Sequence, residues 1–123
     1  FDVEKKGLGR INSDILELAG RAKANKLKPE EFVGGTFTIS NLGMFGIGEF
    51  SAVINGPQAC ILAVGGGIPT VVPGKGGEED EPEVATMMTA RLSGDRTVVD
   101  EEVAARWMQV FKNYAENPKQ MVL

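Results

Sequence analysis

An uninterrupted apolar run in the middle of the chain, residues 59 to 64, constrains the fold more than any other feature. It reads Ala-Cys-Ile-Leu-Ala-Val and contains no charged or amide side chain. Strands that are buried on both faces have this continuous pattern, whereas a strand with one face in water alternates apolar and polar residues. The run therefore predicts a central strand of a sheet that is covered on both sides.

Cys60, inside this run, is the only cysteine of the chain. A single cysteine cannot form an internal disulfide, which fits a reducing compartment. Because its neighbours are apolar, we expect Cys60 to be a small buried hydrophobe and not a reactive nucleophile.

Other segments have the composition of strands and are bounded by glycine, proline or polar residues. These are residues 36 to 40, 51 to 55, 69 to 72 and 83 to 93. Residues 41 to 48 carry three glycines and are expected to form a loop, with Met44 and Phe45 exposed. The glycines at 65 to 67 and the polar segment 73 to 82 are expected to be connectors.

Helices are predicted at both ends of the chain. Apolar residues recur every three or four positions over residues 5 to 25, and residues 28 to 31 resemble a short helical turn. Asp100 can cap a final helix that has Trp107 on its apolar face and ends at Asn117. A helix, several strands in mixed order and a terminal helix predict an α/β sandwich.

Composition excludes several classes of function. The chain has 123 residues, a net charge of -4 and a pI near 4.9, which argue against binding of nucleic acid or of an acidic membrane surface. No apolar stretch approaches the ~20 residues that cross a bilayer. The chain begins Phe-Asp-Val, so we expect it to start partway along a longer protein.

Common ligand motifs also fail. Gly74-Lys75 is followed by glycine, and Pro69 stands where a phosphate-binding loop needs its first glycine. The glycines of residues 43 to 48 have the wrong spacing for a dinucleotide site. With one cysteine and no histidine, the sequence predicts no metal site. The absence of histidine also excludes any imidazole base within these residues.

Two long segments carry a specific resemblance. Residues 34 to 47, Gly-Gly-Thr-Phe-Thr-Ile-Ser-Asn-Leu-Gly-Met-Phe-Gly-Ile, and residues 57 to 65, Pro-Gln-Ala-Cys-Ile-Leu-Ala-Val-Gly, resemble the dihydrolipoamide acyltransferases of 2-oxoacid dehydrogenase complexes, most closely the pyruvate dehydrogenase type. The leading helix, the closing helix with Trp107 and the tail at 118 to 123 continue the match. The resemblance covers nearly all of the chain.

The resemblance implies a fold like that of chloramphenicol acetyltransferase, a mixed-sheet α/β sandwich. The family's domain forms trimers with active sites at subunit boundaries, and the trimers assemble into cubic or icosahedral cores. It is roughly twice as long as this chain, so residues 1 to 123 are expected to be the C-terminal part of a single domain. Coenzyme A as substrate, a lipoyl group on an upstream domain and a mitochondrial matrix location are implied in the same way. No cofactor is expected within these residues.

The family's catalytic motif is Asp-His-Arg-x-x-Asp-Gly, just before the last helix. Residues 95 to 101 align with this motif without a gap, because Leu92-Ser93 upstream and residues 98 to 100 downstream match the family on both sides. Arg96 then occupies the histidine position. Acyl transfer from a thiol needs a base, and a guanidinium with a pKa above ~12 has no available lone pair at neutral pH.

Three other positions of the family site can be compared in the same register. Ser40 matches a hydroxyl that hydrogen bonds to the tetrahedral oxyanion in the family, although it can also be an ordinary hydroxyl at a strand end. Asp100 matches a carboxylate that orients the active-site loop, although here it can simply cap the last helix. Glu101 replaces the motif glycine, and we expect this replacement to require a local rearrangement.

Three functions remain open from the sequence. The first is a noncatalytic core component similar to protein X, which tethers dihydrolipoamide dehydrogenase through upstream domains and forms trimers or joins the acyltransferase core. Its subunit contacts would then use Met44, Phe45, Ile47 and Phe50. The second is an active dihydrolipoamide acetyltransferase that uses a base from elsewhere. The third is a sensor that binds coenzyme A without turnover.

Overall fold

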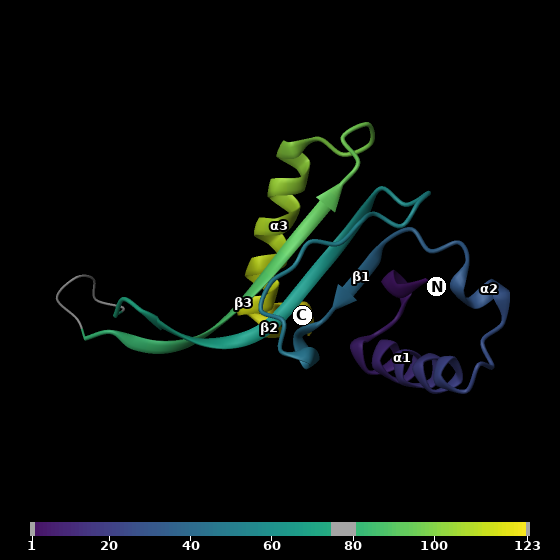
Figure 1. Cartoon of the computed structure of the whole chain (residues 1–123), viewed down its shortest axis with the longest axis horizontal. Coiled ribbons are helices and arrows are strands. Elements are labelled where there is room, and N and C mark those ends of the chain that lie inside the picture. Colours follow the sequence, from purple (N-terminus) through teal and green to yellow (C-terminus); the bar gives the residue numbers. More distant parts are fainter. Residues whose placement is uncertain (1, 75–80, 123) are drawn as a thin grey trace. The chain divides into compact units, whose positions relative to one another are not determined.

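The structure is a computed structural model and describes residues 2 to 74 and 81 to 122. The chain forms two compact units, Phe1–Thr36 and Phe37–Leu123. The first is helical, and the second carries a sheet with a long helix beside it (Figure 1).

The helical unit contains a 3-10 turn, η1 (Val3–Lys5), the helix α1 (Leu8–Lys23) and the short helix α2 (Pro29–Phe32). The helix predicted over residues 5 to 25 is confirmed, but it begins only at Leu8, after Gly7 at the N-cap. The predicted turn at 28 to 31 is also confirmed. Proline at its first position favours a helix start, and the Glu31 carboxylate accepts the Lys28 amide hydrogen at 2.8 Å. Arg21 in α1 joins this carboxylate at 2.6 Å and so ties the two helices together.

The second unit is built on a mixed sheet of three strands in the order β1-β2-β3. The strands are β1 (Thr38–Asn41), β2 (Cys60–Val72) and β3 (Glu83–Gly94). β1 runs parallel to β2 and β3 runs antiparallel to it. One row of the register joins Ser40, Ala63 and Arg91 across all three strands.

The core of the sheet lies at the start of β2, as the apolar run predicted. Cys60, Ile61, Leu62 and Ala63 are between 1% and 8% exposed. The predicted burial of Cys60 is therefore confirmed, and its low reactivity stays a prediction. Burying a side chain such as Leu62 contributes roughly 1.5–3 kcal/mol relative to leaving it in water. This short buried segment pairs with β1 on one side and with β3 on the other, so its burial stabilises both pairings.

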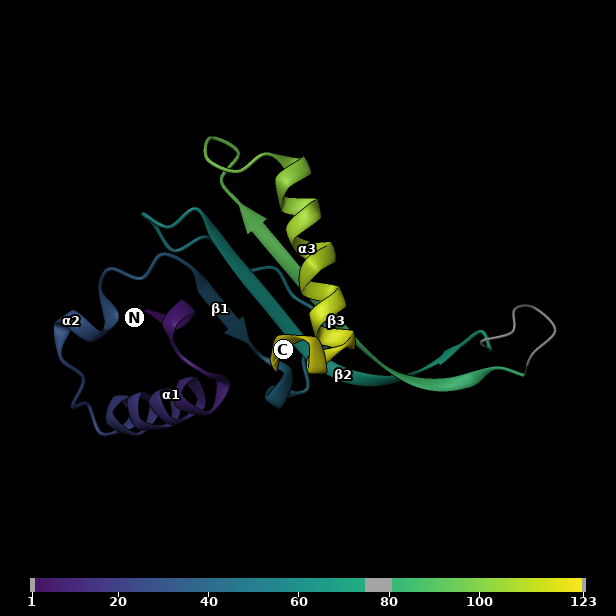
Figure 2. The ribbon, with the colours of Figure 1, turned by 180° about the vertical axis from the view of Figure 1, so that it is seen from behind.

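The last helix, α3 (Glu101–Glu116), lies beside β3 in both views of the ribbon (Figures 1 and 2). It is followed by η3 (Pro118–Val122). Trp107 joins the helix to the entry of β1, because its ring centroid lies 5.6 Å from that of Phe37. Phe111, one turn further along α3, stacks on Trp107 at 5.7 Å. The predicted helix, its apolar face and its end at Asn117 are confirmed.

Two predictions about the middle of the chain are wrong. Residues 51 to 55 form no strand, and β2 continues through the glycines at 65 to 67 instead of ending before them. The glycines admit close backbone contact: a Cβ on Gly65 would overlap the carbonyl oxygen of Gly48, and one on Gly43 would lie 2.9 Å from the Cα of Gly66. The loop that contains η2 (Gly43–Phe45) therefore packs directly on β2.

The remaining predictions for this unit can be compared in the same way. The strands at 36 to 40 and 83 to 93 are confirmed with shifts of one or two residues. The polar connector predicted at 73 to 82 falls largely on residues 75 to 80, which lie outside the described residues. The α/β class is confirmed by the mixed sheet and its helix. Within the described ranges, no helix combines the length and the apolar character that crossing a membrane requires.

Candidate active site

The motif residues form the tight turn between β3 and α3. The amide of Asp95 donates to the carbonyl oxygen of Ala59 at 2.8 Å, which extends the β2–β3 pairing by one step. The Asp95 carboxylate accepts the amide of Thr97 at 2.9 Å and its hydroxyl at 2.7 Å. These two bonds favour the ionised carboxylate, so they hold the pKa of Asp95 below its ordinary value. Asp95 therefore shapes the turn.

Arg96 points into solvent from this turn. Its side chain is 81% exposed, and its Nη2 atom lies 3.2 Å from the Glu101 carboxylate. Water screens an ion pair as exposed as this one, so the pair contributes little to stability. A permanently protonated guanidinium can orient or attract an anion, but it cannot accept the proton of a thiol. The chemistry of this position is that of a cation.

Asp100 caps α3, which is the simpler of the two roles weighed for it. Its Oδ1 accepts the amide of Val103 at 2.8 Å, and its backbone has the extended conformation of an N-cap. Glu101 is the first residue of the helix, and its φ angle is not in the left-handed region. At this position the backbone needs none of the freedom that glycine provides, whereas the expected rearrangement relative to the family stays a prediction. An acidic residue in the first turn also suits the helix dipole.

Ser40 lies away from the turn, on the edge strand β1. Partners in a register row carry their side chains on the same face, so Ser40 and Arg91 share one face of the sheet. α3 covers the opposite face, because Thr86, Met88 and Ala90 of β3 face it. Ser40 and Gly94 lie two strands and three rows apart, so their Cα atoms are on the order of 14 Å apart. The structure does not bring Ser40 and Arg96 together within one chain.

Two residues near these positions were missed by the sequence reasoning. Arg91 lies in the same register row as Ser40, with Ala63 between them. Its guanidinium binds the Glu49 carboxylate at 3.0 Å and lies 3.5 Å from the Ser51 hydroxyl. The sequence signal for Arg91 was a positively charged residue in a strand that consists mostly of apolar and small residues. In the register predicted from the sequence, Thr97 falls on the arginine position of the motif and would be a third departure from it. That signal was already present in the motif register.

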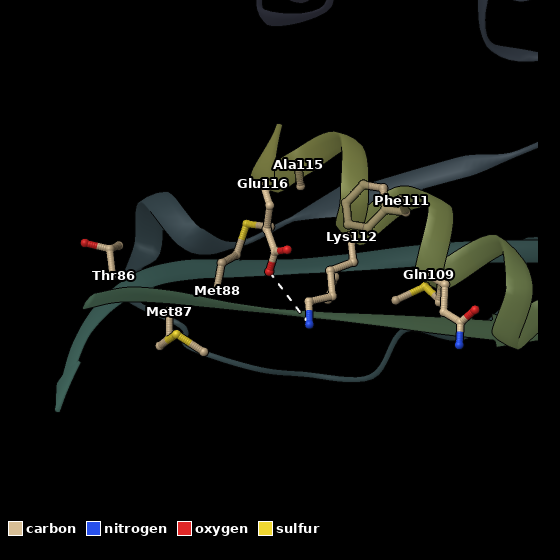
Figure 3. A pocket seen from close by; sticks show the side chains of 10 residues that line it. Thr86, Met87, Met88, Gln109, Phe111, Lys112, Ala115 and Glu116 are labelled. Carbon is tan, nitrogen blue, oxygen red and sulfur yellow. Dashed lines mark ion pairs between the residues drawn. The ribbon is translucent and has the colours of Figure 1, made fainter. Parts of the chain in front are cut away.

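A separate groove of about 600 Å³ lies between β3 and α3 (Figure 3). Met88 and Phe111 point into it from the two elements, and Lys112 and Glu116 form an ion pair of 3.8 Å at its rim. The lining combines methionine thioethers and one aromatic ring with the polar groups of Thr86, Gln109, Lys112 and Glu116. Across the described part of the chain, no group of three or more potential metal ligands is found.

Comparison with known proteins gives the family. The model of the 2-oxoacid dehydrogenases acyltransferase (catalytic domain) matches residues 1–123. The chain belongs to this family. The resemblance inferred from the sequence is therefore confirmed.

Individual members of the acyltransferase family give the degree of similarity. One relative is a dihydrolipoyllysine-residue acetyltransferase component of the mitochondrial pyruvate dehydrogenase complex of Arabidopsis thaliana. The two sequences are 51% identical over 123 residues, and the match covers 99% of this chain and 22% of that protein. It is 47% identical to the mitochondrial pyruvate dehydrogenase protein X component of Mus musculus, over 98% of this chain and 24% of that protein. The chain thus spans about a quarter or less of the length of these relatives.

A solved acyltransferase shares the fold. The dihydrolipoamide acetyltransferase of Azotobacter vinelandii superposes with a TM-score of 0.87 at 28% identity, over 99% of this chain and 49% of that one. This match confirms the predicted fold class, a mixed α/β acyltransferase core. The crystallographic and enzymatic work on that protein concerns a serine, a histidine and an asparagine in its catalytic mechanism, with the last two four positions apart.

Proposed function

We propose that this chain is part of the core of a pyruvate dehydrogenase complex and has an assembly role of the protein X type, without acyltransferase chemistry of its own. One observation carries the proposal. Arg96 stands at the motif's histidine position, and none of the 123 residues is a histidine. Arg96 and Asp100 are four positions apart, like the catalytic histidine and asparagine of the Azotobacter vinelandii enzyme.

The loss of the base is large in energetic terms. General-base assistance contributes about 10²- to 10⁴-fold to a rate. Ser40 keeps a hydroxyl that could stabilise an oxyanion, but such a donor lowers a barrier only when something else removes the thiol proton. Asp100 and Glu101 already serve the start of α3. The residues at these positions therefore suit a structural role better than a catalytic one.

The assembly role is supported by apolar side chains on the loop that packs against β2. Met44 is 84% exposed, Phe45 71% and Ile47 38%, whereas Phe50 is half-buried. Large apolar side chains left in water are typical of subunit contacts. We therefore propose a homotrimer that joins the acyltransferase core, with Met44 and Phe45 in the contact. Three of the four side chains expected at such a contact are exposed.

The wider parts of the proposal rest on the family. Residues 1 to 123 would be the C-terminal part of a single acyltransferase-type domain. Upstream domains would carry a lipoyl group and tether dihydrolipoamide dehydrogenase. The named mitochondrial relatives support a mitochondrial location, and we propose the matrix.

An active dihydrolipoamide acetyltransferase is the second candidate. It is favoured by the 51% identity to a protein named as an acetyltransferase component. It requires a base from residues outside this chain or from a neighbouring subunit. Ser40 and the β3–α3 turn are too far apart to act together within one chain, so any site that used both would have to be completed by another copy.

The deciding experiment measures acetyl transfer from acetyl-coenzyme A to dihydrolipoamide by the full-length protein. The histidine-containing acetyltransferase of the same complex serves as the reference. We expect a rate at least 10²-fold below the reference, because the base is missing. A rate within a few-fold of the reference would overturn the proposal and establish the second candidate.

Two binding measurements complete the test. Full-length protein should co-purify with the acyltransferase core and with dihydrolipoamide dehydrogenase if it has the assembly role. Calorimetry with coenzyme A then separates this role from a sensor. Micromolar binding without turnover and without association with the core would favour the sensor.

A further inference from the structure

We draw no further inference here: the strongest candidate, the groove between β3 and α3 that Met88, Met108 and Phe111 line, is an unpartnered apolar surface, and nothing in the described part of the chain shows what covers it.

Discussion

The guanidinium of Arg96 lies 3.2 Å from the carboxylate of Glu101, so two residues that the sequence predicts to depart from the family motif form an ion pair with each other. Their side chains are 81% and 78% exposed, and water screens the attraction between them. The fold therefore does not depend on this pair. Both positions can be changed to test the chemistry of the turn without unfolding the protein.

Rebuilding the motif should restore part of the activity. We expect full-length protein with Arg96→His, Thr97→Arg and Glu101→Gly to transfer acetyl groups on the order of 10²-fold faster than the unmodified protein, because an imidazole can take the thiol proton. The rate should rise with pH through about 6.5, the ordinary pKa of histidine, as the ring loses its proton. Acetyl transfer to dihydrolipoamide measured between pH 5.5 and 8 would show both effects.

A matched variant separates the base from the other two changes. Arg96→Gln combined with the same Thr97→Arg and Glu101→Gly supplies no base, and we expect it to remain as slow as the unmodified protein. Equal rates for the histidine and glutamine variants would contradict the idea that the base is the missing part.

Substitution of Gly65 should destabilise the sheet. In Gly65→Ala the new Cβ would overlap the backbone oxygen of Gly48, and backbone cannot move aside as a flexible side chain can. We expect a loss of about 1–3 kcal/mol in the free energy of unfolding, as for other overpacked sites. Urea denaturation followed by the fluorescence of Trp107 would measure it.

The control for this change is Gly94→Ala. A Cβ at Gly94 would lie 3.7 Å from the sulfur of Cys60, which is an ordinary van der Waals distance. We expect its urea midpoint to stay close to that of the unmodified protein. If the two alanine variants were equally stable, the close approach of the loop to β2 would be disproved.

Removal of the helix cap should weaken α3. In Asp100→Ala the amide of Val103 loses the carboxylate that accepts it at 2.8 Å. We expect a loss of about 1 kcal/mol, which is typical of an N-cap. Asp100→Asn keeps an acceptor at the same place and should recover most of the loss. Thermal unfolding of the three proteins measures the difference, and an alanine variant as stable as the asparagine variant would argue against the capping role.

Acid should act on the β3–α3 turn through Asp95. Its pKa is lowered by the amide of Thr97 and then by the hydroxyl of the same residue. A carboxyl whose pKa falls on folding contributes stability that is fully present above its unfolded pKa of about 4 and is lost as the pH falls through its folded pKa. Thr97→Val removes the hydroxyl bond alone, so we expect the pKa of Asp95 to rise but to stay below its ordinary value.

The carboxyl carbon of Asp95, followed by NMR from pH 2 to 6, reports this pKa directly. Thr97→Ser keeps a hydroxyl and serves as the control, with a pKa near that of the unmodified protein. Identical titration curves for the valine and serine variants would show that the hydroxyl has no part in the shift.

The proposed subunit contact can be tested at Met44. A carboxylate placed in an apolar contact loses its hydration without gaining a partner, so Met44→Glu should weaken assembly. Met44→Leu keeps an apolar side chain of similar volume and should assemble as the unmodified protein does. Sedimentation of the full-length variants gives their oligomeric state. An unchanged oligomer for Met44→Glu would remove this loop from the proposed contact.

Local patterns were sufficient to predict most of the elements in this chain. The spacing of apolar residues in α1 and α3, the Asp100 cap and the strand-like composition of β3 depend on residues that are close in sequence, and these elements were confirmed. The apolar run at 59 to 64 also predicted the buried segment of β2, because no other environment suits so many apolar side chains in succession.

The same reasoning could not decide the elements that depend on distant partners. Residues 51 to 55 have strand-like composition but no neighbouring strand to pair with among the described residues, so they form none. The glycines at 65 to 67 predict the end of a strand, yet β2 runs on through them, with a register shift between Val64 and Gly67, and it pairs with β3 again from Gly67. Their lack of side chains instead admits the backbone of the loop at 43 to 48.

The sequence by itself determined the family, and it predicts which residues occupy the family's catalytic positions, including Arg96 in place of histidine. The tertiary structure alone decided how these residues are used. Asp100 caps a helix, Glu101 starts it without strain, and Ser40 lies on another strand and in another row from the turn that carries Arg96. The reason is physical: a motif fixes which groups are present, whereas strand register and helix boundaries fix the distances between them.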